Sequence, residues 1–330
     1  MNFFRISIYM LCYLFLSCGE HVAQESNNNN NNNIDYRQEM REFVIEISEI
    51  AKEENPNFIV VPQNGVQLVS KEAKLKKTPA LDYLNAIDAV AQEDLFYGYP
   101  KLNKITPKAD NLYLRKYLDL AKDEGKQVLV TDYCSGFKLM KNSYRLNEEN
   151  NYTSFAAPRR ELDRIPAYPV FNENNKNISH LSEAKNFLYL LNYAEYSSKY
   201  DLITELAFTN YDLIIMDLFF HNEAFTAEDI QKLKKKKNGA ERLVISYMSI
   251  GEAEDYRFYW EENWSSKSPT WLLEENPEWE GNFKVEYWNE DWKDLIYGSE
   301  NAYLSKIIAA GFDGVYLDII DGYQYFEDRE

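Results

Sequence analysis

The sequence predicts an α/β fold with a parallel sheet, and three observations support this prediction. From residue 36 onward, short apolar runs alternate with longer segments of helical periodicity. Eight such runs are present, and residues 36–330 have the size of a (β/α)8 TIM barrel. Several runs end on polar residues, as barrel strands do at their active face. An open doubly wound sheet also carries functional groups at its strand ends, so this last pattern does not distinguish the two folds.

The first residues are predicted to lie outside this fold. Residues 1–17 combine one early positive charge, Arg5, with an apolar stretch too short to span a membrane, which is typical of an export signal. The stretch ends in LFLSC, which resembles a loose bacterial lipobox and predicts lipidation of Cys18. Residues 18–35 are polar and rich in asparagine, which indicates a flexible tether. We therefore expect an exported cell-surface or periplasmic lipoprotein, with ordinary signal cleavage and secretion as the alternative.

Each expected strand is an apolar run bounded by turn residues. In chain order, the eight strands are expected at 57–65, 86–95, 127–134, 187–193, 211–219, 242–252, 283–289 and 314–321. Before the first of them, residues 36–54 carry apolar side chains at helical spacing from Met40 to Ile50. After the last of them, too few residues remain for a full closing helix. Because the first and last units of a closed barrel are neighbours, we expect helix 36–54 to follow the final strand in space.

Composition restricts the partners and cofactors of the chain. It carries 54 acidic and 36 basic residues, for a formal charge of −18, which disfavours nucleic acid and anionic membrane surfaces. Contact with a membrane is expected only through the N-terminal lipid. Cys134 is the one cysteine of the expected folded part, so no disulfide framework forms there. No phosphate-binding glycine motif is present, and His21, His180 and His221 show no zinc spacing, so no cofactor is expected.

Five segments carry a family resemblance. They are NPNFIVVPQNG (55–65), QEDLFYG (92–98), APRRELDRI (157–165), SYMSIGEAEDYRFYW (246–260) and GFDGVYLDIIDGYQYF (311–326). Together they resemble a family of extracellular TIM-barrel proteins related to endo-α-1,4-polygalactosaminidases, glycoside hydrolase family 114. The resemblance covers roughly residues 36–165 and 185–328. It implies a barrel that acts on polysaccharide, with Asp318 at the end of the fifth barrel strand.

The order of these segments differs from that of the family. In the family, the segment similar to NFLYLLNY comes first, and the segment similar to residues 41–65 directly follows the one similar to LDIIDGY. The chain is therefore similar to a circular permutant, whose strands run sixth to eighth and then first to fifth. Residues 166–184 then form the linker that joins the old termini within one domain, 36–330. This arrangement predicts that the regions of Tyr36 and Tyr325 are adjacent.

The resemblance implies glycoside hydrolysis, which uses one protonated and one ionised carboxyl group. Crowding of carboxylates raises the pKa of one of them, which lets it serve as a general acid. We predict that Asp217, Glu252 and Asp318 are catalytic, because they end three strands of one half of the barrel. For each of them, the alternative is a structural role, either in binding Arg257 or in capping a helix.

Other polar and aromatic residues near strand ends are expected to bind substrate, because sugar rings stack on aromatic side chains. This expected set is Gln63, Glu93, Asp132, Tyr247, Asp255, Arg257, Trp288, Asp321 and Tyr323. For a second group of aromatic residues, a lid over a groove and simple packing are equally open. These are Trp260, Trp264, Trp271 and Trp279.

One position departs from the family pattern. The resemblance implies a glutamate acid/base where Tyr316 stands, so that role is either moved to Asp318, Glu252 or Asp217, or lost. The first hypothesis is an exported, polygalactosaminidase-like hydrolase of an α-linked amino-sugar polysaccharide, whose cationic form suits an acidic protein. The alternative is a non-catalytic surface protein that binds glycan on an inactive barrel. A third hypothesis is a metal-dependent hydrolase in which Asp132, Asp217 and Asp318 hold a hard cation.

Overall fold

The computed structural model describes residues 34–72, 78–265 and 267–329. The predicted signal 1–17, the lipidation site Cys18 and nearly all of the predicted tether 18–35 lie outside the described residues. Among the helices of the described ranges, none has the length and apolar character needed to cross a membrane.

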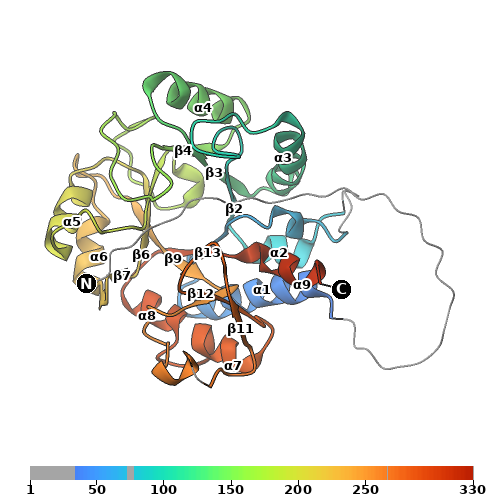
Figure 1. Ribbon diagram of the computed structural model, residues 1–330. Coiled ribbons are helices and arrows are strands. Elements are labelled where there is room, and N and C mark those ends of the chain that lie inside the picture. Colours follow the sequence, from blue (N-terminus) through green and yellow to red (C-terminus); the bar gives the residue numbers. More distant parts are fainter. Residues whose placement is uncertain (1–33, 73–77, 266, 330) are drawn as a thin grey trace.

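Eight parallel strands of the described chain form two sheets at its centre (Figure 1). One sheet has the order β5-β6-β9-β13-β1 and the other β2-β3-β4, and every neighbouring pair in both is parallel. A parallel bridge between Gln63 and Ala91 links the end of β1 to β2, and β4 contacts β5. The bounds are β1 Ile59–Pro62, β2 Ala89–Glu93, β3 Gln127–Tyr133, β4 Thr153–Ala157, β5 Phe187–Leu190, β6 Leu213–Asp217, β9 Leu243–Ser249 and β13 Gly314–Asp318.

Seven of the expected strands occur in these sheets, and the expected strand at 283–289 does not. Its place is taken by β12 (Asn282–Val285), which pairs antiparallel with β10 (Glu252–Glu254) and β11 (Leu272–Glu275) in a separate sheet. Only Val285 of the four β12 residues is buried, so this segment lacks the two-sided burial of a central parallel strand. The missing parallel strand is β4, whose sequence TSFAA is short and contains small residues. Counted from β5, Asp318 therefore ends the fourth strand, and the expectation of a fifth was wrong.

Helices cover the strands from outside, as Figure 1 shows for α3 and α4 beside the β2-β3-β4 sheet and for α5 and α6 beside β6. Helix α1 begins at the N-cap Asp35 and turns a buried stripe of Met40, Phe43, Val44 and Ile47 toward the core. The helices are α1 Tyr36–Glu54, α2 Leu81–Ala86, α3 Lys108–Asp123, α4 Phe137–Glu149, α5 Lys199–Ala207, α6 Ala227–Leu233, α7 Glu290–Lys293, α8 Tyr303–Ala309 and α9 Tyr323–Glu327; the two-residue strands β7 Phe219–Phe220 and β8 Glu223–Ala224 form a hairpin.

The two ends of the described chain meet, which confirms the predicted adjacency of the Tyr36 and Tyr325 regions. The rings of Tyr36 and Phe326 stack with their centroids 5.2 Å apart. Arg37 donates to Glu327 at 2.7 Å, across the contact between α1 and α9. Because β1 pairs with β13, helix α1 lies where a helix following β13 is expected (Figure 1).

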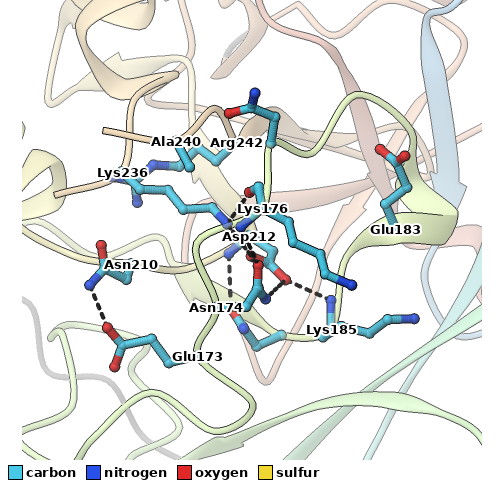
Figure 2. A network of polar contacts seen from close by, with 12 residues as sticks. Glu173, Asn174, Lys176, Glu183, Lys185, Asn210, Asp212, Lys236, Ala240 and Arg242 are labelled. Carbon is cyan, nitrogen blue, oxygen red and sulfur yellow. Dashed lines mark hydrogen bonds and ion pairs between the residues drawn. The ribbon is translucent and has the colours of Figure 1, made fainter. Parts of the chain in front are cut away.

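The segment around the predicted linker 166–184 is anchored by a buried ion pair (Figure 2). Lys236 Nζ lies 2.5 Å from Asp212 Oδ1, and both side chains are fully buried. Asn174 Nδ2 donates to both Asp212 oxygens, at 3.1 and 2.9 Å, and Lys236 Nζ donates to the carbonyl of Lys176 at 2.9 Å. The backbone N–H of Lys185 donates to Asp212 at 2.8 Å. Asp212 directly precedes β6, so this network fixes the segment at the amino ends of the strands.

Candidate active site at the carboxyl ends of the strands

Two carboxylates from different strands accept hydrogen bonds from the same side-chain amide. Gln63, directly after β1, donates from Nε2 to Glu93 Oε2 at 2.8 Å and to Asp318 Oδ1 at 3.2 Å. Since both oxygens lie this close to one nitrogen, they can be separated by no more than about 6 Å. Within the described residues, Gln63 Oε1 is buried and has no hydrogen-bond partner. The structure therefore brings together three residues that the sequence had only assigned separately.

Further donors hold the two carboxylates in place. Tyr247 donates from its hydroxyl to Asp318 Oδ2 at 2.8 Å. Tyr133 donates from its hydroxyl to Glu93 Oε1, and Asn64 Nδ2 donates to Glu93 Oε2 at 3.2 Å. Both acids stand at the carboxyl ends of parallel strands, so their convergence follows from the topology. Tyr247 is thus a hydrogen-bond donor to the Asp318 carboxylate, rather than an exposed ring on which a sugar could stack.

The environment of Asp318 favours its protonated form. Burial, together with the nearby Glu93 carboxylate, raises the pKa of Asp318 to about 8, against the opposing effects of hydrogen bonds from the Ile319 backbone and from Tyr247. Burial also raises the pKa of Asp321 to about 6. Two close carboxyl groups resist being ionised together. At neutral pH, Asp318 therefore holds a proton that it can donate.

The residue directly after Asp318 has a strained backbone conformation. Ile319 has a φ of 58°, in the left-handed region that a β-branched residue rarely adopts. Its carbonyl approaches Gly251 so closely that a Cβ at Gly251 would lie 2.2 Å from Ile319 O. Close packing of the loops after β9 and β13 thus sets the exit direction of the chain at Asp318.

The Asp217 side chain is held by Arg257. Arg257 Nη1 donates to Asp217 Oδ1 at 2.9 Å, and its Nη2 lies 2.8 Å from Oδ2. The same guanidinium donates from Nε to Glu254 at 2.5 Å. Arg257 and both carboxylates are largely buried. This geometry agrees with the structural alternative for Asp217, because its charge is already matched by a bidentate cation.

Both carboxylate oxygens of Glu252 also have partners within the protein. It belongs to β10 rather than to a parallel strand, which corrects its expected position at the end of strand 242–252. The buried carboxylate pairs with Lys284 and accepts from Asn276 at 2.8 Å and from Asn282 at 3.3 Å. Within the described residues, Glu252, Asp217 and Asp318 each have separate hydrogen-bond partners.

Asp132 was expected to bind substrate, and this expectation was wrong. The residue is completely buried and accepts from the backbone N–H groups of Phe96 and Tyr97, at 2.8 and 3.1 Å. Ser143 and Asn147 donate to its other oxygen, at 2.6 and 3.0 Å. Because the loop after β2 fills one of its oxygens and α4 fills the other, Asp132 has a structural role.

Two expected sugar platforms lie away from the carboxylate pair. Tyr323 is fully buried, with the Arg37 guanidinium 4.7 Å from its ring, so its predicted contact with substrate was wrong. Trp288 packs against Tyr36 and Phe326, with centroids 5.2 and 4.7 Å away, where the chain ends meet. Asp255 is exposed, and its backbone N–H donates to Gly281. Asp321 follows β13 and is half-buried.

Most of the tryptophan run packs together with other aromatic rings. Trp264 stacks edge-on against Trp260 and Trp271, with centroids 5.1 Å away in both cases. Trp271 in turn packs against Trp292 at 5.2 Å, so this part of the run is core packing. Trp279 is different, because it is 50% exposed in the turn between β11 and β12.

Sequence reasoning missed the role of Tyr133. Successive side chains of a strand point to opposite faces, so Asp132 and Tyr133 cannot both face the site. The sequence analysis chose the acid, whereas the structure turns Tyr133 to Glu93 and Asp132 toward α4. The available signal was the alternation of side chains along the strand, but the sequence did not show which of the two sets of side chains faces the site.

A shared cation site for Asp132, Asp217 and Asp318 does not occur, because each has its own partners elsewhere. Within residues 34–72, 78–265 and 267–329, no group of three or more histidine, cysteine, aspartate or glutamate side chains could hold a metal ion.

Comparison with known proteins relates the C-terminal half of the chain to a family. The model of glycoside-hydrolase family GH114 matches residues 169–330. The chain is thus GH114-like over residues 169–330. The matched part includes Asp217, Glu252 and Asp318, whereas Gln63 and Glu93 precede it.

Individual relatives of the GH114-like chain are uncharacterized proteins. One from Methanocaldococcus jannaschii is 43% identical over 160 residues, which cover 48% of this chain and 42% of the relative. One from Thermotoga maritima is 46% identical over 84 residues, or 26% of this chain and 25% of the relative. One from Deinococcus radiodurans is 40% identical over 119 residues, or 36% of each chain. The chain thus spans less than half the length of each of these relatives.

Proposed function

We propose that this protein is a glycoside hydrolase that cleaves an α-linked amino-sugar polysaccharide, with Asp318 as acid/base and Glu93 as nucleophile. The observation that carries the proposal is the Gln63 amide, which holds both carboxylates within hydrogen-bond reach of one atom. Asp217 and Glu252 are less suited to the chemistry, because each is already paired with a cation of the protein, Arg257 or Lys284. Asp318 is two residues beyond Tyr316 and on the same face of β13, so it takes the position nearest to the family's implied glutamate.

The proposed reaction follows from the spacing of the two acids. Their nearest oxygens are at most about 6 Å apart, which is closer to the roughly 5–5.5 Å of retaining glycosidases than to the roughly 6.5–9.5 Å of inverting ones. Asp318 donates its proton to the glycosidic oxygen while the bond from that oxygen to the anomeric carbon breaks. Glu93 forms a covalent bond to the anomeric carbon. Asp318 then removes a proton from water, which attacks the same carbon and releases Glu93.

The proposed fold is a closed, circularly permuted (β/α)8 barrel formed by one domain, residues 36–330. Three observations support it: the bridge from β1 to β2, the contact of β4 with β5, and the placement of β1 beside β13. Read around this circle, the strands follow chain order and return from β13 to β1. The linker 166–184 then joins the old termini, and α1 serves as the helix after β13.

Charge and exposed aromatic rings support the proposed substrate. The net charge of −18 favours a cationic polymer, as a partly deacetylated amino-sugar chain is. Trp279 and Tyr256, on the excursion after β9, are 50% and 49% exposed and offer faces for sugar rings. Together with the signal-like residues 1–17 and Cys18, these features support an exported lipoprotein that acts at the cell surface or in the periplasm.

The test is release of reducing ends by the purified protein from amino-sugar and neutral polysaccharides. We expect turnover of an α-linked amino-sugar polymer, with losses of about 10²–10⁴-fold in Asp318→Asn and Glu93→Gln. Asp123→Asn is the matched control, because this exposed acid ends α3 just before the amino end of β3, and it should keep activity. The anomer formed first, followed by proton NMR, should be retained.

Two outcomes would contradict the proposal. Full activity in both site variants would remove Asp318 and Glu93 from the chemistry. Retention of the protein on an immobilised polymer, with no turnover of any polymer, would favour the alternative of a non-catalytic glycan-binding protein.

A further inference from the structure

A second group of residues stands behind Glu93. Arg160, in the loop after β4, places its guanidinium carbon 4.4 Å from the centroid of the Tyr133 ring. Its Nη2 donates to both oxygens of Asp94, at 2.7 and 2.8 Å, and to the carbonyl of Gly98 at 2.5 Å. Arg160 is thereby fixed over Tyr133 from several directions.

The local backbone is shaped for this contact. Asp94 has a φ of 56°, and Gly98 has a φ of 132°, a conformation that other residues rarely adopt. A Cβ at Gly98 would lie 1.6 Å from Asp94 Oδ1, so any side chain there would displace the carboxylate that holds Arg160. The cradle therefore depends on a glycine as well as on an ion pair.

Tyr133 connects this cradle to the carboxylate pair. Its ring lies under the cation, and its hydroxyl donates to Glu93 Oε1. A positive charge on the ring face strengthens the hydroxyl as a donor, and a donor to one oxygen fixes the orientation of the carboxylate. Because Gln63 and Asn64 donate to the other oxygen, Oε2, Tyr133 determines how Oε1 is held.

We propose that Tyr133 and Arg160 are positioning residues that orient the Glu93 carboxylate, Tyr133 through its hydroxyl and Arg160 through the Tyr133 ring. This inference rests on the proposed function. It goes beyond that function because Tyr133 and Arg160 are not the reacting acids. Neither residue bonds to the Gln63 amide that joins Glu93 and Asp318, and Arg160 acts only through Tyr133.

Several charged or titratable groups face Glu93 and set the background for this effect. Ionised carboxyl groups repel the Glu93 carboxylate, whereas the Arg160 guanidinium attracts it. These groups are Asp94, Asp318, Asp321, Tyr133, Tyr189, Tyr316 and Arg160. Burial raises the pKa of Asp94 to about 7, against the lowering effect of Arg160. Loss of Arg160 would thus change both the charge over Tyr133 and the state of Asp94.

The experiment compares Tyr133→Phe, Arg160→Gln and Arg160→Lys with the unmodified protein. For Tyr133→Phe and Arg160→Gln we expect kcat to fall about tenfold or more, with KM changed less than about threefold. The acid limb of the kcat/KM profile should move to higher pH by about one unit, because the limb reports the essential base of the free enzyme. Arg160→Lys keeps the charge and should restore part of the loss.

A second readout does not depend on activity. The carboxyl carbon of Glu93, assigned with the Glu93→Gln variant in protein labelled at glutamate, can be followed by carbon-13 NMR as pH is varied. We expect its titration to move in Tyr133→Phe and Arg160→Gln. An unchanged titration and an unchanged pH profile in Tyr133→Phe would overturn the inference, and this variant removes only one oxygen, so it should fold. A moved titration in a protein without turnover would instead refute the proposed function alone.

Discussion

Replacement of Asp318 by asparagine should change how stability depends on pH. Burial and Glu93 raise the pKa of Asp318 from 3.8 to about 8 in the folded chain. The folded state therefore binds this proton more tightly than the unfolded state, and stability falls as pH rises from about 4 to about 8. Each unit of pKa shift corresponds to roughly 1.4 kcal/mol, so a shift of about four units sets an upper limit of about 6 kcal/mol. Relaxation and partial exposure of Asp318 reduce this to about 2–4 kcal/mol.

Urea unfolding at pH 5 and at pH 8.5 measures the effect. The unmodified protein should lose about 2–4 kcal/mol more than Asp318→Asn between the two pH values, because asparagine does not titrate. Asp321, whose raised pKa acts in the same direction, is present in both proteins and cancels in the comparison. The control is Asp328→Asn, an exposed position that should follow the unmodified protein. Equal pH dependence in Asp318→Asn and the unmodified protein would refute the raised pKa.

Two further predictions concern the fold. Lys236→Met should lower the free energy of unfolding in urea by about 3–5 kcal/mol, because it leaves Asp212 charged and buried. Adding Asp212→Asn to this variant should recover much of the loss. If Lys236→Met alone were as stable as the unmodified protein, the buried ion pair would be contradicted. Phe326→Ala should lower the free energy of unfolding by about 1–3 kcal/mol, because it removes the ring that stacks on Tyr36. It should also speed hydrogen exchange of the α1 backbone amides. Unchanged protection of α1 would show that the chain ends are not coupled.

Much of the fold was readable from local patterns. The apolar stripe of α1 and the apolar runs of β3, β6, β9 and β13 predict their elements because burial imposes a period on the sequence. The failures have a physical reason as well. β4 is short and contains small residues, so it carries little hydrophobic signal, whereas the segment at 283–289 is aromatic and β-prone but pairs in a peripheral antiparallel sheet.

The roles of the acids required the tertiary structure. The sequence shows Gln63, Glu93, Asp217 and Asp318 only as polar residues at strand ends, and on that basis it assigned catalysis to Asp217 and not to Glu93. Their differences arise from neighbours that are distant along the chain, such as Arg257 beside Asp217 or the amide of Gln63 between two acids. A side chain's protonation and charge balance depend on these neighbours and on burial, which residue spacing does not encode.

By itself, the sequence determined an α/β chain with parallel strands, an acidic surface, a resemblance to GH114 and a set of polar strand ends. It also predicted that the first helix and the last strand are neighbours, because a lone helix and an uncovered strand each leave an apolar face that must be buried. Only the tertiary structure decided that Glu93, and not Asp217 or Glu252, faces Asp318. The reason is that parallel strands bring their ends together in space, while the side chains that neutralise or free each acid come from loops whose course follows no period in the sequence.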